Sequence, residues 1–66
     1  MNIDIEKVNW IRIEKGLSIT KLAQKAKISK STISRLFRSE VKARPDTIGK
    51  IAIALEVPVR ELFSNE

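Results

Sequence analysis

Two helix-start signals in direct succession constrain this chain more than any other feature of its sequence. In each signal an apolar residue precedes a serine: Leu17 stands before Ser18, and Ile28 stands before Ser29. A serine at this position caps a helix by accepting a hydrogen bond from a backbone N–H of the first turn, and the apolar residue before it can pack against the new helix. The two signals therefore predict two short helices joined by a tight turn, over residues 19–26 and 30–37.

The rest of the sequence also has helical periodicity and no long strand-like alternation. A first helix is expected over residues 5–15, ended by Gly16 in the left-handed conformation that glycine favours. After a polar loop, Pro45 suits the first turn of a fourth helix, and Pro58 suits that of a short fifth helix that ends at Phe63. The expected core positions are Val8, Ile11, Leu22, Ala23, Ala26, Ile28, Ile33, Leu36, Ile48, Ile51, Ala52 and Leu55. We therefore expect an all-α fold, in which the whole chain forms one compact five-helix domain.

The composition excludes several classes of function. The chain has 66 residues, no cysteine, no histidine and only two glycines, so disulfides, thiolate metal sites and glycine-rich phosphate loops are excluded. No apolar run is long enough to span a bilayer, and the early acidic residues Asp4 and Glu6 do not suit a signal peptide. No pair of titratable groups is placed for acid–base catalysis. We expect a binding domain that is not an enzyme, with no cofactor, metal, membrane or small-molecule partner.

The positive charge of the chain is concentrated in its middle third. The chain carries 13 Lys and Arg against 8 Asp and Glu, a net charge of +5. Residues 21–44 carry eight basic residues against Glu40 alone, which gives 8 − 1 = +7, whereas residues 1–20 sum to zero and residues 45–66 to −2. The middle segment would attract a polyanion. Charge asymmetry alone would equally fit a solvated basic face that binds nothing.

The predicted third helix carries a polar and cationic stripe opposite its core positions. Ser31, Ser34, Arg35 and Arg38 follow the i, i+3, i+4, i+7 spacing of one helix face. With the helix before it, this segment forms a helix-turn-helix over about residues 19–38, in which the second helix can enter the major groove of DNA. Short serines let the backbone approach the bases, an arginine can donate two hydrogen bonds to a guanine, and the N–H groups that begin both helices can receive phosphates. The alternative for the arginines is ordinary solvation.

Five segments in a fixed order connect the chain with a known family. They are Val8–Ser18, Leu22–Ala26, Ile28–Leu36, Thr47–Val57 and Glu61–Phe63. Together they resemble the phage repressor and Cro type of helix-turn-helix, the xenobiotic-response-element family of bacterial regulators, over nearly the whole chain. The resemblance implies a lambda-repressor-like fold. It also implies a cytoplasmic transcriptional regulator, bacterial or phage-derived, that acts as a repressor and binds a palindromic operator in double-stranded DNA as a homodimer.

The resemblance further implies roles for individual residues. The positions that contact bases in the family are matched by Lys30, Ser31, Ser34 and Arg35. The positions that contact phosphates are matched by Ser29, Thr20, Arg38, Lys42 and Arg44. The positions at or near a dimer contact are matched by Val59, Glu61, Leu62 and Arg12.

Three positions depart from the family pattern. Ile19 stands where relatives often have a phosphate-binding glutamine, so Thr20 or a backbone N–H is expected to take that phosphate. Lys27 stands where glycine is usual in the turn, and a left-handed backbone there would cost roughly 1 kcal/mol relative to glycine. Phe37 replaces an acidic residue that in relatives pairs with the arginine matched by Arg12. Phe37 is therefore expected in the core or against the only tryptophan.

Two other functions are compatible with the same fold. An antitoxin-type autoregulator would bind DNA and also a toxin partner. A protein-interaction module of helix-turn-helix shape would have lost DNA binding, which the +7 middle third disfavours. Trp10 is expected in the core or at an interface, because no second exposed aromatic accompanies it for the stacking of bases.

Overall fold

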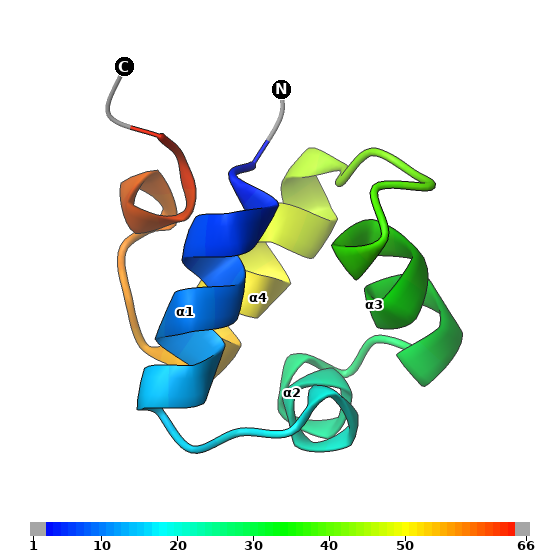
Figure 1. Ribbon diagram of the computed structural model, residues 1–66, viewed down its shortest axis with the longest axis horizontal. Coiled ribbons are helices and arrows are strands. Elements are labelled where there is room, and N and C mark those ends of the chain that lie inside the picture. Colours follow the sequence, from blue (N-terminus) through cyan, green and yellow to red (C-terminus); the bar gives the residue numbers. More distant parts are fainter. Residues whose placement is uncertain (1–2, 65–66) are drawn as a thin grey trace.

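Four α-helices and one short 3₁₀ helix make up the described part of the chain, residues 3–64 of a computed structural model (Figure 1). Their bounds are α1 Ile5–Glu14, α2 Ile19–Ala26, α3 Lys30–Phe37, α4 Pro45–Leu55 and the 3₁₀ helix η1 Val59–Leu62. No strand occurs within residues 3–64. The expected all-α class is therefore confirmed.

The serine caps fix the starts of α2 and α3. Ser18 Oγ accepts a hydrogen bond from the backbone N–H of Lys21 at 3.0 Å, and Ser29 Oγ accepts one from that of Thr32 at 3.2 Å. Each bond satisfies one of the N–H groups that a helix start leaves without a partner in the helix. The predicted bounds of both helices, 19–26 and 30–37, are confirmed.

Left-handed residues make the two turns that connect α1, α2 and α3. Gly16 follows α1 with φ 70°, and the N–H of Leu17 then bonds to the carbonyl of Arg12 at 3.1 Å. Lys27 ends α2 with φ 58° and ψ 43°. The lysine thus adopts the left-handed conformation in which a glycine would be unstrained.

The expected fifth helix is only one turn of 3₁₀ helix, so the five-helix prediction is wrong in this respect. Pro58 has φ −63° and ψ 150° and lies outside the helix as its N-cap, not in its first turn. The N–H of Glu61 bonds to the Pro58 carbonyl at 2.9 Å, a spacing of three residues, and Phe63 is already extended. The N–H of Phe63 likewise bonds to the carbonyl of Arg60, again three residues earlier, so the turn has the tighter hydrogen bonding of a 3₁₀ helix.

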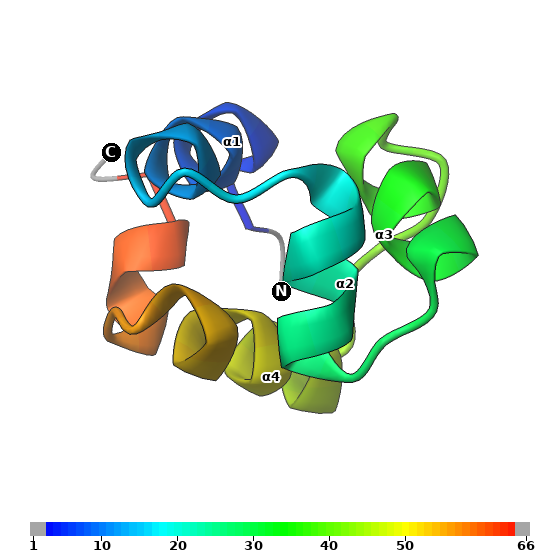
Figure 2. The ribbon, with the colours of Figure 1, turned by 90° about the horizontal axis from the view of Figure 1, so that it is seen from below.

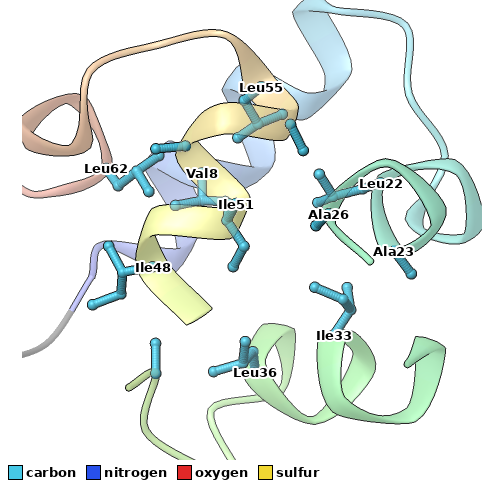
Figure 3. Close-up of a cluster of buried hydrophobic side chains, with 13 residues drawn as sticks. Val8, Leu22, Ala23, Ala26, Ile33, Leu36, Ile48, Ile51, Leu55 and Leu62 are labelled. Atoms are coloured by element: carbon cyan, nitrogen blue, oxygen red, sulfur yellow. The ribbon is translucent and has the colours of Figure 1, made fainter. Parts of the chain in front are cut away.

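The buried side chains form one cluster between the helices (Figure 3). In it α2 packs against α3 and α4, while η1 packs against α1 and α4. The largest fully buried side chains are Leu22, Ile33, Leu36, Ile48, Ile51, Leu55, Leu62 and Val8. The predicted core positions are confirmed, with Ile11 and Ile28 partly buried at the edge. No polar residue is buried within the described range.

This packing corrects one prediction about an individual apolar residue and narrows another. Leu62 has no exposed surface, so the assignment of its side chain to a dimer contact is wrong: the side chain fills the core of its own chain. Trp10 is 64% exposed, which excludes a core position, and the alternative position at an interface stays a prediction. Phe37 is partly buried and packs against the core, as expected.

Candidate nucleic-acid interface

The outward face of α3 carries the residues expected to meet DNA. Ile33 and Leu36 anchor the helix, with 0% and 2% of their surfaces exposed. On the opposite side Ser31, Arg35 and Arg38 are exposed and Ser34 is half-buried. The interior therefore leaves this face free. Together with Lys30 these four residues are called the recognition surface.

The five residues of the recognition surface lie around one open depression. Lys30, Ser31, Ser34, Arg35 and Arg38 line a hollow of about 360 Å³. Its lining has three cationic side chains, no carboxylate and no large apolar group, which favours an anionic partner. Arg38 Nε also lies 3.2 Å from Glu40 Oε2, but both groups are exposed and such pairs are weak, so the arginine can exchange this partner for a phosphate.

The starts of α2 and α3 add backbone donors beside this surface. Ser29 is engaged as the cap of α3, and its Oγ also lies 2.8 Å from the hydroxyl oxygen of Thr32. The other N–H groups of the first turn have no acceptor within the helix, and the helix dipole gives this end a positive potential. Thr20 is exposed in the first turn of α2. Both helix starts can therefore donate hydrogen bonds to phosphates.

Two further cations lie in the loop between α3 and α4. Lys42 and Arg44 are exposed on either side of Ala43, which is 8% exposed and fixes the loop to the core. Arg44 Nε is 3.9 Å from Asp46 Oδ1, a contact between two exposed groups. The loop lies at the same end of the molecule as α3, with η1 at the opposite end (Figures 1 and 2). Lys42 and Arg44 thus extend the positive end that α3 provides.

The residues expected at a dimer contact do not share one environment. Val59 is 43% exposed, and Glu61 is exposed with its Oε2 3.8 Å from Lys7 Nζ. Arg12 is half-buried and its guanidinium contacts its own chain, where Nη1 donates to the carbonyl of Leu17 at 2.6 Å. With Leu62 in the core, only Val59 and Glu61 remain exposed for a partner.

The most exposed large apolar residue of the described range was not singled out from the sequence. Ile53, on α4, is 79% exposed. The signal was present, because at 100° per residue Ile53 falls outside the stripe formed by Ile48, Ile51 and Leu55. An isoleucine on the polar side of a helix is a candidate for contact with another molecule.

Residues 3–64 contain no group of three or more His, Cys, Asp or Glu that could hold a metal ion. No helix in the same range has the length and apolar character needed to cross a membrane. A second hollow of about 600 Å³ lies between α1 and the segment that contains η1, with Trp10, Ile11 and Val57 among its lining residues.

Comparisons with known proteins agree with this geometry. No curated protein matches the sequence. Among solved structures, the chain is similar to the restriction-modification controller protein C.AhdI from Aeromonas hydrophila, with a TM-score of 0.86, 30% sequence identity and 89% of each chain covered. Residues 8–62 match the sequence model of the helix-turn-helix family. The chain therefore belongs to the Cro/C1-type helix-turn-helix family of DNA-binding transcription regulators.

Proposed function

We propose that this protein is a repressor that inserts α3 into the major groove of a specific DNA sequence and binds a palindromic operator as a homodimer. The observation that carries the proposal is the recognition surface: five polar or cationic side chains around one depression, on the side of α3 opposite Ile33 and Leu36. A helix presented in this way can reach the edges of bases.

Two sets of contacts have different tasks in this proposal. Lys30, Ser31, Ser34 and Arg35 contact bases and discriminate between sequences. Ser29, Thr20, Arg38, Lys42 and Arg44 contact phosphates and hold the domain in register. Exposure of the charged members and the capped helix starts support this division. Base contacts require α3 to lie deeper in the groove than the flanking loop, because bases lie below the phosphates.

A second copy of the chain completes the proposed site. One recognition helix reads one half-site, and two such helices must lie about one helical turn, roughly 34 Å, apart. One protomer measures 29 × 24 × 19 Å, so two protomers joined away from α3 can span that distance. A two-fold contact at the η1 end of the domain is supported by two exposed apolar side chains, Val59 on η1 and Ile53 on α4. Glu61 would lie at the edge of this contact. The side chain of Arg12 is engaged within its own chain, so it has only a minor part in this contact.

Selection of bound duplexes from a random DNA pool tests the proposal. We expect enrichment of one site with two inverted half-sites whose centres are one helical turn apart. The absence of any enriched sequence would contradict sequence-specific binding, and a single half-site would contradict the dimer. A reporter gene whose promoter overlaps the enriched site then tests the direction of control: its expression should fall when the protein is present, and a rise would contradict repression.

A further inference from the structure

One arginine connects three parts of the domain. Arg12 lies on α1, and its Nε and Nη2 donate hydrogen bonds to Oδ1 of Asn9 at 3.0 and 2.6 Å. Its Nη1 donates to the carbonyl of Leu17 at 2.6 Å, and its Cζ lies 5.8 Å from the centre of the Phe37 ring. The guanidinium thus contacts α1 itself, the residue before the cap of α2, and the last residue of α3.

These contacts restrain the start of α2 and the end of α3, the two helices of the helix-turn-helix. Leu17 directly precedes Ser18, whose side chain starts α2, so the bond to its carbonyl fixes the entry into that helix. Phe37 is the C-terminal residue of α3. A cation over the face of an aromatic ring at this separation is attracted by the ring quadrupole. Asn9 holds the guanidinium by accepting from two of its nitrogens, which limits its movement.

The end of α3 needs such a restraint because the helix is short. It has eight residues, and only Ile33 and Leu36 are fully buried. Two neighbouring anchors allow the helix to tilt about the line between them. Even a small tilt would displace Ser31 and Arg35, and the two hydrogen bonds of an arginine to a guanine require a narrow geometry. Contacts to phosphates tolerate more displacement, since flexible cationic side chains make them.

We propose that Arg12 is a positioning residue that orients α2 and α3 against α1, through the Leu17 carbonyl and the Phe37 ring, and thereby sets the discrimination between DNA sequences. The inference rests on the proposed role of α3 in contacting bases. It gives Arg12 a role within one protomer, where the sequence predicted only a position at or near the dimer contact.

The test compares affinity for the selected DNA site with affinity for a scrambled duplex, by fluorescence anisotropy at fixed salt. Arg12→Lys keeps the charge but loses the planar fork of donors, and Phe37→Leu loses the ring but stays apolar. We expect both variants to lower the ratio of specific to nonspecific affinity about three- to tenfold, the size of one hydrogen bond for Arg12→Lys and of one cation–π contact for Phe37→Leu. Phe37→Tyr keeps a ring and should keep the wild-type ratio. Nonspecific affinity should change by less than about twofold, because it depends on phosphate contacts.

The control is Glu14→Asp, an equally conservative change at an exposed residue of α1 that takes no part in the Arg12 contacts. All variants are measured at a temperature at which circular dichroism shows them to be folded. An unchanged ratio in Arg12→Lys and Phe37→Leu would overturn the positioning role. The same role would be overturned if specific and nonspecific affinity fell equally and in proportion to the loss of folding stability. Failure of the wild-type protein to distinguish the two duplexes would instead overturn the proposed function, and the positioning role with it.

Discussion

Arg35 is exposed one turn after Ser31 and lines the depression on α3. We predict that Arg35→Ala weakens binding to the selected site by about 1–3 kcal/mol, because the two hydrogen bonds to one guanine are lost. The preference should relax at that base pair and persist at the others. Titration of the selected duplex and its single-base variants measures both effects. An unchanged titration of the selected duplex would show that Arg35 does not contact a base.

Lys42 has the same charge but a different expected partner. Its loop position beside buried Ala43 directs it toward the DNA backbone in the proposed complex. Lys42→Ala should weaken binding to all sequences alike and flatten the slope of log affinity against log salt concentration by about one unit, since one phosphate contact is lost. Lys50→Ala, at an exposed lysine of α4, is the matched control. A loss confined to one DNA sequence would contradict a phosphate contact.

Lys27 carries backbone strain in the turn between the two helices, with φ 58°. Lys27→Gly should raise the free energy of unfolding by about 0.5–1 kcal/mol, because glycine adopts the left-handed region without the steric penalty of a Cβ. Lys27→Ala also removes the charge but keeps the Cβ, so it should give no such gain. Urea unfolding followed by circular dichroism compares the three proteins. Equal stabilities of the glycine and alanine variants would argue against strain at this residue.

The single turn of η1 is held to the domain by one fully buried side chain. Leu62 is 0% exposed, and its carbonyl accepts the N–H of Asp4 at 2.8 Å. Leu62→Ala should lower the free energy of unfolding by about 2–5 kcal/mol, through lost burial and the cavity that remains. Val59→Ala, at a residue 43% exposed in the same turn, should cost less than about 1 kcal/mol. Equal losses in urea denaturation would contradict this account of η1.

The helices whose signals are local could be predicted residue by residue. Ser18 and Ser29 cap α2 and α3, and each cap needs only the chain within one turn of it. The element after Pro58 could not be predicted in this way. A proline indicates that a helix begins nearby, but the extended backbone at Phe63 ends the element after four residues. The length of this element cannot be predicted from a local pattern, because it depends on packing against α1 and α4.

The candidate site could be predicted only where it depends on one helix. The stripe on α3 follows from helical spacing, and its exposure agrees with that prediction. The proximity of Arg12 and Phe37 was implied only by the resemblance, in which an arginine pairs with an acidic residue at these positions; helical spacing alone does not give it, because it depends on how α1 crosses the end of α3. The buried face of α1 was predicted at Val8 and Ile11, although apolar residues occur on several of its sides and only Val8 is fully buried.

At the scale of the whole molecule, the proposed DNA contact and the proposed dimer contact lie apart. The recognition surface lies at one end, and Val59 lies on η1 at the other (Figures 1 and 2). We predict that Val59→Glu weakens self-association at least about tenfold, because a carboxylate would be buried without a partner in the two-fold contact. Sedimentation velocity measures the change. Val41→Glu is the control, since Val41 is 42% exposed in the loop beside α3. Equal behaviour of the two variants would contradict a contact through η1.

The proposed function depends on which face of the domain meets DNA. Titration of the ¹⁵N-labelled protein with its selected duplex, followed by amide chemical shifts, tests this directly. The largest changes should occur over residues 29–38, with smaller ones at Thr20 and residues 42–44, and α1 and η1 should change little. Largest changes on α1 or η1, with Ser31 and Arg35 unmoved, would contradict the insertion of α3 into the major groove.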